Sequence, residues 1–268
     1  MDDPDLKLLI IVVVLAVAAG ATWYYRDDIW PPPDQPVEMS SKPAVVDAPE
    51  KQAPRHPITP LEDVESPQRE LVPLPPLDDS DSYFLLALVD VFGKNIEPLL
   101  VTEALIDKFV ATVDNLPRDH VAEKIRPAGR LTTAFRVEAT SGDGPIYLSH
   151  ANYERYDHLV GQLASADINA LVDTYRRFYP LLQQSYERLG YPGAYFNDRV
   201  VEVIDHLLAT PQPDEPIRLV RPHVLYEFAD PELEDLSSGQ KLLLRMGSEH
   251  TALIKRVLRE LRAVLARQ

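Results

Sequence analysis

The feature that most constrains this chain is an uncharged apolar run close to its N-terminus. The 18 residues Leu8–Tyr25 hold no charged side chain, although the whole chain has a formal net charge of −15. As a helix with about 1.5 Å of rise per residue, the run would be roughly 27 Å long, which matches the hydrocarbon layer of a bilayer. It ends in the aromatic residues Trp23–Tyr25, whose rings favour the lipid headgroups. We therefore expect residues 8–25 to form a transmembrane helix in the lipid bilayer, after a short tail of residues 1–7.

A cleaved signal peptide is the main alternative for this run. Ala19 and Ala21 form a small-x-small pair of the kind that a signal peptidase accepts. The leading residues "MDDPDLK" are acidic, however, where a signal peptide carries positive charge. We therefore favour a retained anchor over a cleaved signal, and both over a buried helix of a soluble protein. Lys7 and Arg26 nearly balance across the run, and the proline-rich segment that follows favours a periplasmic C-terminal part.

The next segment is rich in proline. Residues 31–77 hold 13 of the 25 prolines in the chain and no aromatic residue. Proline fixes φ and removes a backbone donor, so neither helices nor sheets propagate through such a segment. We expect residues 26–77 to form a disordered linker that acts as a semi-rigid spacer.

Helical periodicity dominates residues 78–268, where we expect the folded domain. Alternating residues in "LTTAFRVEA", followed by the turn residues "SGDG", predict a β-hairpin from about Leu131 to Ser149. The stretch "IRLVRPHVLYEF" predicts one or two short extended pieces. The fold class is therefore a mostly helical α+β domain with a small β-hairpin.

Capping residues suggest where the helices begin. We expect Ser80 and Thr102 to cap the first two helices, Asn197 a later one, and Ser237 and Ser248 the last two. Asp230, followed by a proline, is expected to start a short helix between them. In the longest helix, Pro180 is expected to cause a kink or a break after Tyr179. The last helix has an apolar stripe, which favours a core helix over one that docks on a membrane surface.

Several kinds of chemistry are disfavoured by composition and motif. The chain has no cysteine, and no two of its seven histidines are four residues apart, so we expect no metal site. Residues 78–268 carry 29 acidic and 21 basic side chains, a balance that does not suit nucleic acid as a partner. The string "SSGQKLLLRMG" lacks the first glycine and the hydroxyl of a P-loop. We therefore expect no catalytic residues and no cofactor.

One group of aromatic and basic residues remains as a candidate interaction surface. Tyrosines with arginines nearby can line a groove for a sugar or a peptide. Packing of the rings in the core, with hydroxyls at its rim, is the favoured alternative. The residues concerned are Tyr153, Tyr156, Arg176, Arg177 and Tyr186.

Several stretches resemble a known family. They are "LPPLDDSD", "FVATVDNLPR", "YPLLQQSYERLGYP", "LRELR" and, most specifically, "VLYEFADPELEDLSSGQKLLLRMG" at 224–247. Together they make residues 74–268 similar to a domain-of-unknown-function family of single-span inner-membrane proteins of Gram-negative bacteria. The resemblance implies a single-pass protein of the bacterial inner membrane, and it implies no activity and no site residues.

Anchor, spacer and folded domain together predict a non-catalytic envelope protein that binds or scaffolds another protein or an envelope polymer. One alternative is an envelope-associated hydrolase with a cleft lined by the tyrosines and arginines named above. The other is a structural subunit of a membrane complex, held through its span and its last helix.

Overall fold

A computed structural model describes residues 53–60, 73–128, 134–139, 144–164 and 167–266. Within these ranges no helix combines the length and the apolar character needed to cross a membrane. The expected transmembrane helix at residues 8–25 lies outside the described residues.

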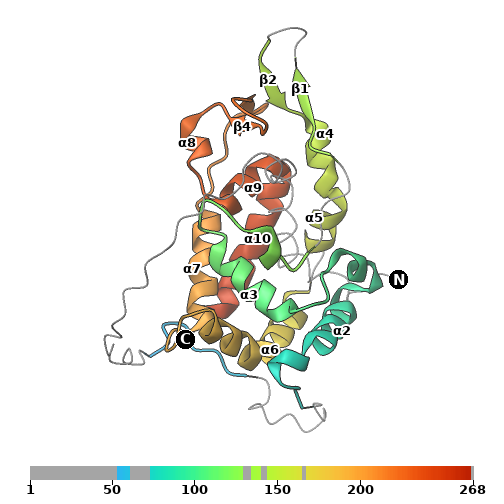
Figure 1. Ribbon diagram of the computed structural model, residues 1–268, viewed down its shortest axis with the longest axis vertical. Coiled ribbons are helices and arrows are strands. Elements are labelled where there is room, and N and C mark those ends of the chain that lie inside the picture. The colour runs from blue at the N-terminus through green and yellow to red at the C-terminus, as the bar shows by residue number, and fades with distance from the viewer. Residues whose placement is uncertain (1–52, 61–72, 129–133, 140–143, 165–166, 267–268) are drawn as a thin grey trace, which may run out of the picture.

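The described residues are mostly helical, as expected (Figure 1). The longer helices are α2 (Asp81–Phe92), α3 (Leu105–Asn115), α5 (Asp157–Ala164), α6 (Ile168–Arg188), α7 (Phe196–Leu208), α9 (Ser238–Met246) and α10 (Ser248–Leu265). The shorter ones are α4 (His150–Tyr153), α8 (Pro231–Glu234) and four 3-10 turns, η4 (Leu77–Asp79), η5 (Lys94–Leu99), η6 (Glu123–Ile125) and η7 (Glu154–Tyr156).

Helix α10 lies in the middle of the main hydrophobic core. It contacts α5, α6, α7 and α9, and its apolar stripe is buried, with Leu258 fully inaccessible. Val110 of α3 and Leu207 of α7 are equally inaccessible and belong to the same cluster. The prediction that the last helix is a core helix is therefore confirmed.

The strands form one small antiparallel sheet at the end of the molecule opposite α2 and α6 (Figure 1). The hairpin expected from Leu131 to Ser149 is confirmed where it is described. The sequence did not reveal that the later extended pieces join it, with Ile146 paired to Leu219 and Leu219 to Phe228. A second hydrophobic cluster lies under this sheet. The strands are β1 (Val137–Ala139), β2 (Ile146–Leu148), β3 (Arg218–Val220) and β4 (Glu227–Phe228), in the order β1-β2-β3-β4.

Two of the expected helix starts are confirmed. Asp230 precedes α8, and its side chain accepts a hydrogen bond from the backbone N–H of Glu232. Ser237 precedes α9 and forms a capping box with Gln240, in which each side chain accepts from the other residue's backbone N–H. The glycine-lysine string at this point is thus the beginning of a capped helix.

The other expected caps differ in part or in full. Ser80 stands at the cap position of α2, as expected, but its side chain makes no capping bond and donates instead to the carbonyl of Leu77, 2.6 Å away. Ser248 is the first residue of α10, and Gly247, at φ +87°, takes the cap position. Asn197 lies inside the first turn of α7, after Tyr195 at the cap position. For Asn197 and Ser248 local spacing fits a cap, but the helix begins at a different residue, and at α10 a glycine in the left-handed region takes the cap position.

Pro180 does not break α6, which runs as one helix from Ile168 to Arg188. The proline itself is exposed, whereas Phe178 and Leu182 on either side of it are buried in the main core. Packing therefore holds both halves of the helix in place despite the missing backbone donor.

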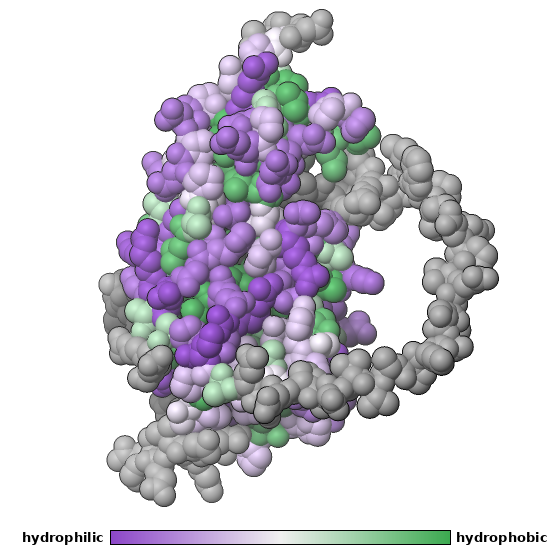
Figure 2. All heavy atoms as spheres, turned by 90° about the vertical axis from the view of Figure 1, so that its left-hand side faces the viewer, coloured by the Kyte–Doolittle hydropathy of each residue, from purple (hydrophilic) through white to green (hydrophobic). Residues whose placement is uncertain are grey.

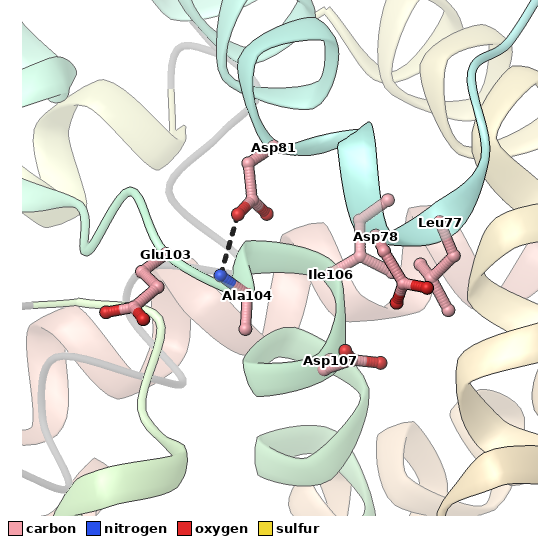
Figure 3. Close-up of a pocket in the computed structure, with 7 residues that line it drawn as sticks. All are labelled: Leu77, Asp78, Asp81, Glu103, Ala104, Ile106 and Asp107. Atoms are coloured by element: carbon pink, nitrogen blue, oxygen red, sulfur yellow. Dashed lines mark hydrogen bonds between the residues drawn. The ribbon is translucent and has the colours of Figure 1, made fainter.

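The start of α3 is capped by a side chain from another helix. Thr102 was expected to cap it, but the cap residue is Ala104, in the left-handed region at φ +51°. The carboxylate of Asp81, at the start of α2, accepts from the backbone N–H of Ala104 at 2.7 Å (Figure 3). It also accepts from the backbone N–H of Leu105 at 2.7 Å. Asp81 thus satisfies two free donors of α3 and holds Ala104 in a conformation that alanine rarely adopts.

We predict that Asp81→Ala lowers the free energy of unfolding by about 0.5–2 kcal/mol, the usual loss for a helix cap. Thr102→Ala is the matched control and should leave stability unchanged, because no side-chain bond from Thr102 caps α3. Urea unfolding of both variants measures the difference. Equal losses would contradict the assignment of the cap to Asp81.

Candidate functional site

Part of the proline-rich segment lies on the folded domain. We call residues 53–60 the strap. It passes beside α7 close to the C-terminus, where Figure 1 draws it in blue. Within residues 26–77, which we expect to form a disordered linker, the strap is hydrogen-bonded to the folded domain.

The domain recognises the backbone of the strap. The carboxylate of Asp198 accepts from two successive backbone N–H groups, that of Arg55 at 2.9 Å and that of His56 at 2.7 Å. The Nδ2 of Asn197 donates to the carbonyl of His56 at 2.8 Å. Backbone groups on an extended segment are thus bound much as in peptide-binding sites, where main-chain hydrogen bonds supply affinity.

Asn197 is fixed in place by the domain itself. It is 0% exposed, its Nδ2 also donates to the carbonyl of Leu265 in α10, and its Oδ1 accepts from the hydroxyl of Tyr175 in α6. One carboxamide therefore joins three helices to the strap. This use of all its bonding groups explains why Asn197 is buried within α7 and does not cap it.

Side chains of alternating charge connect the strap to the core. Arg55 bonds Glu202 on α7, and Glu202 pairs with Arg199 at 3.3 Å. Arg199 in turn pairs with Asp114 of α3 at 2.9 Å and also donates to its backbone carbonyl. Burial by itself would raise the pKa of Glu202, but its bonds to Arg55 and Arg199 outweigh burial and hold that pKa below its usual value.

Asp114 is the buried end of this series and is only 2% exposed. Besides Arg199, it accepts from Arg118 at 2.8 Å and from the hydroxyl of Tyr191 at 3.1 Å. Its charge is therefore fully compensated inside the fold, and it ties α3 to α7 and to the loop before it.

The strap is bound less deeply than the residues that hold it. None of its residues is fully buried, and half-buried and exposed positions alternate along it, as in an extended segment. The side chain of Arg55 is 61% exposed, and Ile58 packs against the edge of the main core. We define the groove as the surface formed by Asn197, Asp198 and Glu202.

A hollow of about 210 Å³ lies between η4, α2 and α3 (Figure 3). Four carboxylates line it, and three of them are bonded to the fold. Asp81 caps α3, Asp107 accepts from Ser185, and Asp78 pairs with Arg188. In the described part of the chain, no three His, Asp or Glu side chains are grouped to hold a metal ion. These carboxylates therefore have structural roles.

The tyrosines of the candidate interaction surface are buried. Tyr153, Tyr156 and Tyr186 are 8%, 0% and 5% exposed. Tyr153 lies in the cluster under the sheet, whereas the other two belong to the main core. Arg176 and Arg177 are half-buried on α6. The structure thus does not bring the five together on one accessible face.

The outer surface offers no large apolar area on the face that Figure 2 shows. Hydrophilic residues predominate there, and hydrophobic ones lie in small separate patches. This distribution suits a chain with 42 acidic and 27 basic residues. The groove is defined by hydrogen-bonding and charged groups and not by apolar area.

We predict that Asp114→Ala lowers the free energy of unfolding by about 1–3 kcal/mol, because it removes the buried carboxylate that accepts from Arg199, Arg118 and Tyr191. The matched control is Asp205→Ala, which breaks the exposed pair with Arg262 and should lower stability by less than about 1 kcal/mol. Chemical unfolding measures both. A loss for Asp114→Ala no larger than that for the control would contradict the role of Asp114.

We also predict that stability falls in alkaline solution. Burial raises the pKa of Tyr153, Tyr179 and Tyr186 to about 12, whereas a tyrosine in the unfolded chain has a pKa of about 10. Between about pH 10 and about pH 12 the unfolded state loses protons that the folded state keeps, so rising pH favours unfolding. Denaturant unfolding across this range tests the prediction.

Tyr153→Phe should reduce this alkaline loss. Its hydroxyl is buried and has no hydrogen-bond partner among the described residues, so near neutral pH the variant should be as stable as the unmodified chain or more so. Tyr83→Phe, at an exposed position on α2, is the control and should leave the pH dependence unchanged. An identical pH dependence in all three chains would refute the assignment.

A family model described as a protein of unknown function, DUF3014, matches residues 105–262, more than half of the 268-residue chain. No curated protein and no solved structure matches the chain. The matched region contains the groove on α7 but not the strap, which precedes it. The resemblance to a domain-of-unknown-function family is thereby confirmed over the matched residues. The chain belongs to the DUF3014 family.

Proposed function

We propose that this protein is a membrane-tethered, non-catalytic module of the bacterial envelope that binds another protein. Residues 8–25 would cross the inner membrane of a Gram-negative cell once, and the folded domain would lie in the periplasm. The proline-rich segment would hold the domain away from the bilayer.

The strap is the observation that carries this proposal. Through Asp198 and Asn197 the domain binds an extended segment by its main chain, with two N–H donors and one carbonyl acceptor in succession. A surface that already binds a peptide backbone favours a protein partner, because the main-chain N–H and C=O groups of an extended peptide match its acceptors and donor directly.

The two alternatives drawn from the sequence have less support. A hydrolase cleft lined by the tyrosines would need them exposed, and Tyr153, Tyr156 and Tyr186 are buried. A structural subunit held through its last helix would need α10 free to dock, and α10 lies within the main core. A binding module requires neither exposed tyrosines nor an accessible α10.

Crosslinking in intact cells, followed by purification of the full chain, tests the proposal. We expect a reproducible set of partner proteins, and protease should reach the domain in spheroplasts but not in intact cells. Mass measurement of the mature N-terminus should find the apolar run still attached. A domain that is protected in spheroplasts, or a chain that carbonate releases from membranes, would contradict the proposed location.

A further inference from the structure

The strap occupies a site that the domain offers ready-made. We propose that an extended peptide of another protein displaces the strap from the groove, and that this peptide carries an arginine three residues before a branched aliphatic residue. The inference rests on the proposed function, because it names the surface through which the module binds its partner.

The groove is built without help from the strap. Asn197 is held by Leu265 and Tyr175, and Glu202 is held by Arg199, so both keep their positions when the strap leaves. The groove is therefore preorganised, which lowers the loss of conformational entropy when a ligand binds.

Asp198 requires an occupant. Its side chain is only 12% exposed, and among the described residues the hydrogen bonds that it accepts come from the strap, from Arg55 and from His56. A carboxylate with so little access to water is stabilised by donors in the protein. The groove thus favours any segment that presents two successive N–H groups to Asp198.

Two side chains of the strap define what such a ligand carries. Arg55 meets Glu202, and Ile58, three residues later, packs at the edge of the main core. The hydrogen bonds from the strap to Asp198 and Asn197 come from its backbone, and other extended sequences without proline at the two N–H positions provide the same groups. The ligand is therefore an extended peptide with a basic residue and, three positions on, a branched aliphatic one.

A foreign peptide fits the observations better than the strap of a second copy. The chain's own strap is joined to the domain through residues 61–72, and so short a connection gives it an effective concentration in the millimolar range. An identical strap from a second copy has no advantage over it. A peptide of another protein has a different sequence, and it displaces the strap when it binds the groove tightly enough to overcome this effective concentration.

The test uses a fluorescent synthetic peptide of the strap sequence, APRHPITP, and the full chain in detergent micelles. In the chain variant Arg55→Glu the built-in strap is weakened by repulsion from Glu202. We expect the labelled peptide to bind this variant at least about tenfold more tightly than the unmodified chain, because the competing strap is impaired. Fluorescence anisotropy measures both affinities.

Variants of the groove provide the controls. In the Arg55→Glu background, Asp198→Asn should weaken peptide binding by about tenfold or more, because it removes the charge that accepts two N–H bonds. Asp205→Asn, on the same helix but paired with Arg262, should leave binding unchanged. Thermal unfolding of each variant shows that it is folded. As a second check, Glu202→Arg in the chain that keeps its own Arg55 repels the built-in strap and should bind a peptide in which glutamate replaces the arginine.

Two outcomes would overturn the proposal. The first is peptide binding that does not differ between the unmodified chain and Arg55→Glu, or that is insensitive to Asp198→Asn. The second is a dimer of the unmodified chain that Asp198→Asn dissociates, which would assign the groove to the strap of a second copy. If peptide binding fails while crosslinked partners are retained, only the groove assignment is lost. The loss of both would remove the proposed function as well.

Discussion

The contact between Asp114 and Arg199 is the interaction on which the rest of the site depends. A buried carboxylate is stable in a protein interior only when it is paired and hydrogen-bonded, and Arg199 meets this need with two bonds, one to the side chain and one to the backbone of Asp114. The same arginine orients Glu202, and Glu202 orients Arg55. A charge buried in α3 thus determines where a surface segment can bind.

The helices of this fold follow from their hydrophobic periodicity, but several of their ends do not. Ser237 was correctly expected to cap α9 because its partner Gln240 is only three residues away. The cap of α3 could not be found in this way, since Asp81 lies 23 residues before Ala104. Capping by a distant carboxylate leaves no local pattern, and Thr102 offered a plausible local one.

The candidate site was even harder to predict from the sequence, because its contacts also join residues that are far apart along the chain. The proline content of the strap correctly indicates that it is neither helix nor sheet. Composition does not reveal, however, that this extended segment is bound to the folded domain. The acceptor Asp198 is 142 residues from His56 along the chain. Nothing in the sequence distinguishes it from the many other acidic residues of an acidic chain. The tyrosines were easier to notice, and they are buried because large rings pack well in a core.

The position of the strap also determines which part of the domain first bears a force applied to the N-terminal side of the chain. Any tension from the N-terminal side reaches the domain at α7, through a short row of hydrogen bonds, before it reaches α2. If residues 8–25 anchor the chain as proposed, the 27 residues from 26 to 52 would lie between the membrane and the bound strap and could span at most about 80 Å. Release of the strap would add the 24 residues before Leu77, about 75 Å more. Under that proposal the strap would set the working length of the tether, and a force that detaches it would let the domain move farther from the membrane.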